Sequence, residues 1–193
     1  MSDLQAMFDS EMERRLSGPD WGPSIREPFL ALCGMIRDTV ASGGTIFICG
    51  NGGSAAQAQH FAAELVGRFK RERRGISAIA LSVDTSIVTS IANDYGFEQV
   101  FERQVQSLMH PGDLLLGLST SGTSPNVVRA LRWAHEQDYT TAALTGAGGG
   151  ELLDITDVCV TVPSTETDLI QEHHLILIHI LADVAERTVE STL

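Results

Sequence analysis

The stretch TIFICGNGGSAAQAQHFAAELVGRF, residues 45–69, contains an apolar run, a glycine-rich loop and a helical pattern in direct succession. Residues 45–50 are β-rich and almost continuously apolar, which is typical of a strand that is buried on both faces of a sheet. Residues 54–68 carry a helical pattern. A strand that leads through a short loop into a helix is the first half of a strand–helix–strand unit, so this stretch indicates a parallel sheet.

Four further apolar runs follow, with room for helices between them. They are residues 77–82, 114–119, 141–146 and 158–163. Helical patterns cover residues 85–107, with a break near NDYGF, and residues 124–137. Alternating strands and helices produce a parallel sheet that is covered on both sides. We therefore predict an α/β three-layer sandwich with a five-stranded parallel sheet of flavodoxin-like order, in which the first and third strands are neighbours.

Helical patterns also occupy both ends of the chain, at residues 3–17, 24–41 and 168–190. The middle of the last one, LILIHILADV, is apolar almost all round. A helix that is apolar on every side is buried on every side, and in so small a domain we expect another subunit to supply part of the cover. We predict a single domain over residues 1–193, with the helices of residues 1–42 contributing to a homo-oligomer.

Composition excludes several classes of function. The net charge of −12 argues against a nucleic-acid partner, because phosphate backbones require a basic face. We find no apolar stretch long enough to span a membrane, and the charged N-terminus does not resemble a signal peptide. Cys33, Cys49 and Cys159 form no CxxC pair, so we interpret them as small apolar residues in a reducing cytoplasm.

Two loops that follow predicted strands suit an anion. The first is Gly50–Ser54, and the second is the hydroxyl-rich Ser119–Ser124, which leads into a helix with Pro125 in its first turn. In open parallel sheets, ligands bind beyond the carboxyl ends of the strands where the strand order reverses, and helix N-termini attract phosphate. The absence of a lysine and of GxxxxGK[ST] argues against a P-loop nucleotidase. Ordinary glycine and serine turns are the alternative.

His60 and Glu64 are spaced i, i+4 directly after the first of these loops, so their side chains share one helix face. Nitrogen and oxygen donors at this spacing suit a divalent metal or an acid–base pair, although a surface ion pair is the alternative. Residues 68–74 are basic, and we interpret most of them as a solvated helix end, with Arg68 as a candidate to face the site.

The terminal helix holds a second set of possible ligands. By spacing alone Gln171 and His174 form the natural pair, whereas His179 lies in an apolar run, where a core histidine is the usual interpretation. Gln171 and His179 are eight positions apart, or ~12 Å along a helix axis. The spacing leaves open which of these side chains, and from which subunit, meets His60 and Glu64.

Several segments together resemble one family. GNGGSAAQAQHFAAELVGRF, IANDYGF, STSGTSPNV, ALTGAGGGEL, VPS and IQEHHLILIHI are similar, in unbroken order from about residue 25 to the end, to the phosphoheptose isomerases of the sugar-isomerase (SIS) superfamily. The resemblance implies a homotetramer with active sites at subunit interfaces. It also implies interconversion of sedoheptulose 7-phosphate and D-glycero-D-manno-heptose 7-phosphate, the first step toward activated heptose for cell-surface polysaccharide such as lipopolysaccharide.

The resemblance also implies the roles of individual residues. One Zn²⁺ per subunit is expected on His60, Glu64, Gln171 and His179. The expected substrate contacts are Asn51, Gly52, Gly53, Glu64, Asn93, Asp94, Ser119, Thr120, Ser121, Ser124 and Gln171. For an isomerisation through an enediol, we expect Glu64 to act as base and His179 as acid.

The sequence departs from the family pattern at one position. Gln57 stands where family members often carry Asp, three residues before the metal-ligand histidine, which predicts a slower enzyme or one that uses a water in its place. Two other interpretations remain. One is a non-catalytic SIS domain that binds a sugar phosphate or a replication initiator, but those relatives lack the helix glutamate that Glu64 supplies. The other is a different SIS enzyme, such as a hexose-phosphate isomerase.

Overall fold

The computed structural model describes residues 2–16, 18 and 22–190. In these ranges five strands form one sheet: β1 (Ile46–Gly50), β2 (Ala78–Ala80), β3 (Leu114–Ser119), β4 (Thr140–Thr145) and β5 (Val158–Thr161). All neighbouring strands are parallel, in the order β2-β1-β3-β4-β5. The predicted fold class and the predicted pairing of the first and third strands are therefore confirmed.

Helices account for most of the remaining described residues. They are α1 (Ser2–Leu16), α2 (Pro23–Ser42), α3 (Gly53–Val66), α4 (Thr85–Tyr95), α5 (Glu102–Leu108), α6 (Pro125–Glu136), α7 (Leu152–Ile155) and α8 (Thr167–Glu190), with a 3₁₀ turn at Phe97–Gln99. The break predicted near NDYGF separates α4 from this turn and from α5. The predicted end of the first helix, residue 17, lies outside the described residues. Within the described ranges, none of the helices combines the length and the apolar character that crossing a membrane would need.

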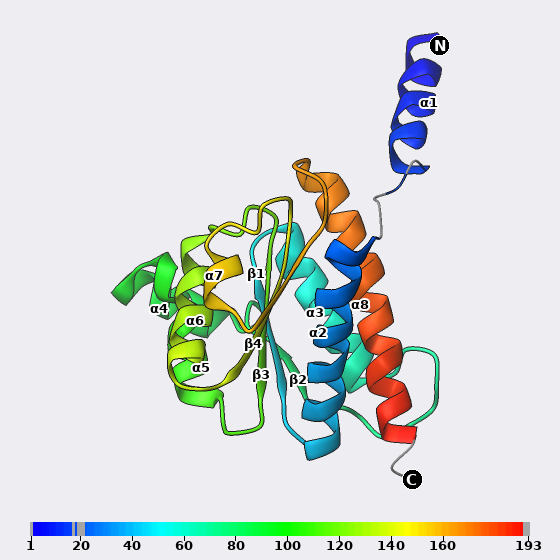
Figure 1. Ribbon diagram of the computed structural model, residues 1–193. Helices are drawn as coiled ribbons and strands as arrows, with labels where there is room; N and C mark the ends of the chain where they lie inside the picture. The colour runs from blue at the N-terminus through cyan, green and yellow to red at the C-terminus, as the bar shows by residue number, and fades with distance from the viewer. Residues whose placement is uncertain (1, 17, 19–21, 191–193) are drawn as a thin grey trace.

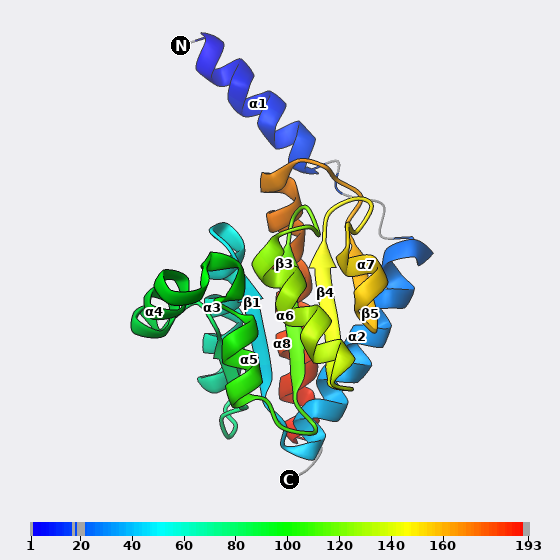
Figure 2. The ribbon, with the colours of Figure 1, turned by 90° about the vertical axis from the view of Figure 1, so that its left-hand side faces the viewer.

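The sheet has a hydrophobic core on each face. Successive side chains of a strand point to opposite faces, so Ile46 and Ile48 pack with α2, α3 and α8, while Phe47 and Cys49 pack with α5 and α6. Figures 1 and 2 show the resulting three layers, with α4 to α7 on one side of the sheet and α2, α3 and α8 on the other. Burial raises the pKa of Cys49 to about 12, so this thiol behaves as an apolar core group, as predicted.

Two predicted strands are longer than the observed ones by two residues or more. The strand predicted at 77–82 is only β2, because this edge strand pairs with β1 alone and the chain then turns to Asp84, whose carboxylate caps α4. The strand predicted at 158–163 ends at Thr161, two residues before Pro163, which has no N–H to donate to a neighbouring strand. Neither difference affects the strand ends at β1 and β3, where the candidate site lies.

Candidate active site

The two loops predicted to hold an anion lie side by side. The last residue of β1, Gly50, pairs with Leu118 near the end of β3, so both loops leave the same edge of the sheet, where the strand order reverses. Asn51 and Asn126 join them, because the amide of each donates to the side-chain oxygen of the other at 2.8 Å. Asn126 is buried in the first turn of α6 and was missed by the sequence analysis, although it follows directly after the hydroxyl loop.

Hydrogen bonds within the second loop hold its hydroxyl groups together. Ser119 Oγ lies 3.0 Å from Ser124 Oγ and accepts the backbone N–H of Gly122 at 3.1 Å. Ser121 Oγ is exposed and accepts both the backbone N–H (3.2 Å) and the hydroxyl (3.1 Å) of Thr123. Gly122 has φ +67°, and a Cβ there would lie 1.9 Å from the carbonyl oxygen of Gly149, so only glycine permits this turn. The loop thus presents hydroxyl and N–H donors at the N-terminus of α6, a combination that suits a phosphate.

His60 and Glu64 of α3 meet His179 of α8. Oε1 of Glu64 lies 3.1 Å from Nε2 of His60 and 3.6 Å from Nε2 of His179, and the two Nε2 atoms lie 3.1 Å apart. The Glu64 side chain is only 12% exposed, and its second oxygen, Oε2, is buried and has no hydrogen-bond partner within the described part of the chain. The structure therefore places His179 of α8 beside His60 and Glu64. It does not place there His174, which the spacing from Gln171 had suggested.

Gln171, the remaining predicted metal ligand, lies near the first turn of α3. A Cβ on Gly53 would lie 2.5 Å from Oε1 of Gln171, so the glycine makes room for this amide. Gln57 Nε2 donates to the backbone oxygen of Gln171 at 2.6 Å, which gives this residue a structural contact at the site. Among the described residues, Gln171 makes no hydrogen bond to His60, Glu64 or His179, so its place as the fourth metal ligand stays a prediction.

The three converging residues fit a divalent metal ion. Two imidazole nitrogens and one carboxylate oxygen lie within 4.8 Å of one another. This donor set is typical of zinc and similar ions, which take nitrogen and oxygen ligands. The buried carboxylate of Glu64 also fits, because its Oε2 finds no hydrogen-bond partner in the residues that the structure describes, and a buried carboxylate is costly unless hydrogen bonds or a cation compensate its charge.

Two of the predicted substrate contacts, Asn93 and Asp94, lie on a different helix, α4. Asn93 and Asp94 are exposed at the end of α4, where Asn93 Nδ2 donates to Asp94 Oδ1 at 2.8 Å. In Figures 1 and 2, α4 stands away from α8. Arg68 is exposed, with Nε 4.0 Å from Oε2 of Glu72, and the suggestion that it faces the site stays a prediction.

The interpretation of residues 68–74 as a solvated helix end needs correction. The helix ends earlier, at Val66, and the basic residues lie in the loop that follows it. The side chain of Arg73 is fully buried against the equally buried side chain of Glu186, a partner 113 positions away that local sequence does not indicate. The same loop carries Phe69, whose ring stacks on His179 with centroids 5.5 Å apart, and which the sequence analysis did not identify.

Comparison with known proteins places these features in context. The SIS domain family profile matches residues 24–146. Phosphoheptose isomerases are 54% identical over 81% of this chain and 83% of the relative in Geobacter metallireducens, and 46% identical over 95% and 93% in Helicobacter hepaticus. The solved phosphoheptose isomerase GmhA of Neisseria gonorrhoeae is 39% identical, with a TM-score of 0.82 over 96% of this chain and 98% of that one.

Proposed function

The chain belongs to the phosphoheptose isomerases of the SIS domain family, and from this premise we propose how its site works. The activity is isomerisation of a heptose phosphate. The specific reaction that we propose is the interconversion of sedoheptulose 7-phosphate and D-glycero-D-manno-heptose 7-phosphate through an enediol. The observation that carries the proposal is the convergence of Glu64, His60 and His179 from α3 and α8, in a chain that also carries the hydroxyl loop after β3.

The reaction moves one proton between C1 and C2 and redistributes two oxygen-bound protons. We assign the carbon-bound proton to Glu64, which takes it from C1 of the ketose and returns it to C2. His179 serves the two oxygens, donating a proton to the carbonyl oxygen as the enediol forms and accepting one from the neighbouring hydroxyl as the aldose forms. A positioned base of this kind supplies roughly 10²–10⁴-fold in rate.

Glu64 and His179 are each proposed for two roles, metal binding and proton transfer, and for His179 the two roles alternate because an Nε2 bound to a metal ion carries no proton. Oε1 faces both imidazoles, whereas Oε2 is buried and has no hydrogen-bond partner among the described residues. We propose that Oε1, with Nε2 of His60 and of His179, would hold a zinc ion, one per subunit, with Gln171 as the fourth candidate. When bound, such an ion supplies Lewis-acid polarisation of the substrate oxygens.

Local donors hold the phosphate, because the net charge of −12 repels it at long range. Ser119, Thr120, Ser121 and Ser124 surround the start of α6, and hydrogen bonds to a charged group contribute ~1.5–3 kcal/mol each. The helix dipole adds only ~0.3–1 kcal/mol. The hydroxyl and N–H donors therefore provide most of the affinity. Asn51, Gly52, Gly53 and Gln171 remain the proposed contacts to the rest of the sugar.

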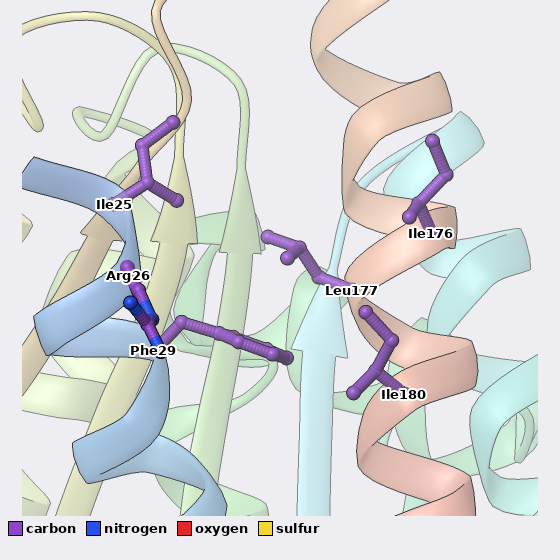
Figure 3. Close-up of a pocket in the computed structure, with 6 residues that line it drawn as sticks. All are labelled: Ile25, Arg26, Phe29, Ile176, Leu177 and Ile180. Atoms are coloured by element: carbon purple, nitrogen blue, oxygen red, sulfur yellow. The ribbon is translucent and has the colours of Figure 1, made fainter. Parts of the chain in front are cut away.

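A second copy of the chain is proposed to cover the exposed apolar surface. An open apolar groove of about 400 Å³ lies between α2 and α8, where Ile176 is 48% and Ile180 44% exposed. Figure 3 shows the side chains that line it. Helix α1 extends away from the sheet and exposes an i, i+4 stripe of Leu4, Phe8, Met12 and Leu16. We propose a homotetramer in which these surfaces are buried and in which Asn93 and Asp94 reach the site of a neighbouring copy.

The experiment that tests this function is an assay of the purified protein with sedoheptulose 7-phosphate, with the products resolved by NMR. Interconversion with the aldose, and little or no turnover of shorter ketose phosphates, is the expected result. A preference for a hexose phosphate would indicate a different SIS enzyme. Substrate-induced thermal stabilisation without any turnover would instead indicate a non-catalytic sugar-phosphate sensor.

We also propose a cytoplasmic location. The free thiols of Cys33, Cys49 and Cys159 are consistent with it, because disulfides are rare in that compartment.

A further inference from the structure

The loop between α3 and β2, residues 67–75, is attached to α8 by one buried carboxylate. Oε1 of Glu186 accepts the backbone N–H of Phe69 at 2.8 Å, and Oε2 accepts those of Lys70 (2.9 Å) and Arg71 (3.1 Å). The Glu186 side chain is fully buried. Figure 1 shows this loop beside the C-terminal half of α8. Because three successive N–H groups depend on one side chain, the path of the loop depends on Glu186.

Arg73 extends this attachment to the helix that carries Glu64. Its guanidinium is fully buried, with Nε 3.3 Å from Oε1 of Glu186. Its other nitrogens donate to the backbone oxygens of Glu64 (2.7 Å), Leu65 (2.8 Å) and Gly67 (3.0 Å). These oxygens lie at the C-terminus of α3, where a cation satisfies carbonyl groups that have no partner in the helix.

Phe69 brings the loop into contact with the candidate site. Its ring stacks on the His179 imidazole with an interplanar angle of 7° and centroids 5.5 Å apart. Glu186 follows His179 by seven positions, so the two side chains leave α8 on the same face, two turns apart. The carboxylate that orders the loop and the histidine that its ring touches therefore both face α3.

We propose that Glu186, acting through Arg73 and Phe69, is a positioning residue of the isomerase site. It fixes the orientation of the His179 ring, and it fixes the C-terminal turn of α3 that carries Glu64. Neither Glu186 nor Phe69 contacts the reacting atoms in this proposal. Their effect is to keep Nε2 of His179 within reach of Glu64 and His60. The proposal rests on the proposed function, because it concerns the residues assigned there to metal binding and proton transfer.

The test compares two carboxylate-to-amide substitutions on the same helix. Glu186→Gln keeps one oxygen acceptor for the loop but removes the charge that Arg73 faces. Asp183→Asn is the matched control, because in the described part of the chain the Asp183 carboxylate binds the side chains of Arg71 and Arg187 but none of the loop's backbone N–H groups. Phe69→Leu removes the stacked ring without changing any buried charge. Each variant is first checked for a cooperative thermal transition.

Two readouts separate positioning from a general loss of structure. Glu186→Gln should lower kcat by about 10- to 100-fold and leave KM nearly unchanged, since groups that orient a metal ligand typically have effects of this size. It should also weaken Zn²⁺ binding by the metal-free protein over a similar range, measured by competition with a chromophoric chelator. Phe69→Leu should also lower kcat and weaken Zn²⁺ binding. Asp183→Asn should have the kcat and the Zn²⁺ affinity of the wild type.

Equal kcat and equal Zn²⁺ affinity in Glu186→Gln and Asp183→Asn would overturn the proposal, as would a loss confined to KM. If Glu186→Gln does not fold, wild-type values for Phe69→Leu overturn it and lowered values support it. Failure of the proposed function is distinguishable, because it appears as an inactive wild type. In that case the Zn²⁺ competition still tests the positioning of His179.

Discussion

Nε2 of His60 and Nε2 of His179 lie 3.1 Å apart, although these residues belong to different helices and are 119 positions apart. Two imidazole nitrogens at this distance require a proton or a cation between them, because neutral nitrogens that present lone pairs to each other repel. Oε1 of Glu64 lies within 3.6 Å of both and supplies the negative charge that favours a cation. This relationship leads to the first prediction.

Removal of metal should lower both activity and stability. Dialysis against a chelator should reduce kcat, and added Zn²⁺ should restore it. Zn²⁺ at 100 times its dissociation constant should add about 2.7 kcal/mol to the free energy of unfolding, which a rise in Tm would report. His179→Gln should lose this rise, whereas His135→Gln should keep it, because His135 pairs with Asp157 away from the site. An equal Zn²⁺-induced rise in both variants would contradict the assignment of His179.

Glu64→Gln tests the base. Measured at saturating Zn²⁺, its kcat should fall by roughly 10²–10⁴-fold, because an amide cannot accept the carbon-bound proton. The fold should persist, since Gln is of nearly the same size and the carboxylate makes no backbone hydrogen bond in the described part of the chain. A kcat near that of the wild type would exclude Glu64 as the base.

Asn126→Ala should raise KM far more than it lowers kcat. The substitution removes the partner that orients the Asn51 amide, and Asn51 is a proposed substrate contact. It also removes the oxygen that accepts the Val127 N–H at 3.0 Å, so we expect a stability loss of about 1–3 kcal/mol. A double-mutant cycle with Asn51→Ala isolates the pair, and a coupling energy near zero would show that the contact is not significant.

Ile180→Glu should dissociate the proposed oligomer. This residue borders the apolar groove between α2 and α8, and a carboxylate there would be buried without a partner at a subunit interface. Leu153→Glu, at a 50% exposed apolar residue on α7, is the control for charge and solubility. Size-exclusion chromatography with light scattering should show a smaller species for Ile180→Glu alone. A mass unchanged from wild type would exclude this groove as an interface.

Acid should destabilise the fold through His174. Burial, the largest cause, lowers the pKa of this fully buried imidazole from the ordinary 6.5 to about 4, although the backbone of Thr145 acts in the opposite direction. The unfolded chain therefore binds the proton more readily than the folded one. The contribution of neutral His174 to the free energy of unfolding is therefore complete above about pH 6.5. It is lost as the pH falls toward 4, and the total loss is about 3 kcal/mol.

Urea unfolding at pH 7 and pH 5 measures this loss, and comparison with His174→Leu isolates the histidine from the carboxylates that also titrate. Burial lowers the pKa of His173 as well, so part of the slope should remain in the variant. A pH dependence identical in both proteins would contradict the assignment.

The fold was predictable because its signals are local. Strands β1 and β3 are apolar on both faces, and the glycine-rich and hydroxyl-rich loops directly follow them, so the strand ends were located almost to the residue. The helical spacing of His60 and Glu64 likewise placed them on one face. The length of the edge strand β2 was overestimated, because the number of residues that pair in a strand depends on the neighbouring strand and not on the strand's own composition.

The sequence by itself determined the alternation of strands and helices, the two loops and the pair on α3. Only the tertiary structure decided that His179, and not His174, completes the cluster, that Asn126 joins the two loops, and that Arg73 is buried. Each of these outcomes depends on the packing of elements that are far apart along the chain. Helical periodicity places a side chain on a face, but the contact it makes is set by the element packed against that face.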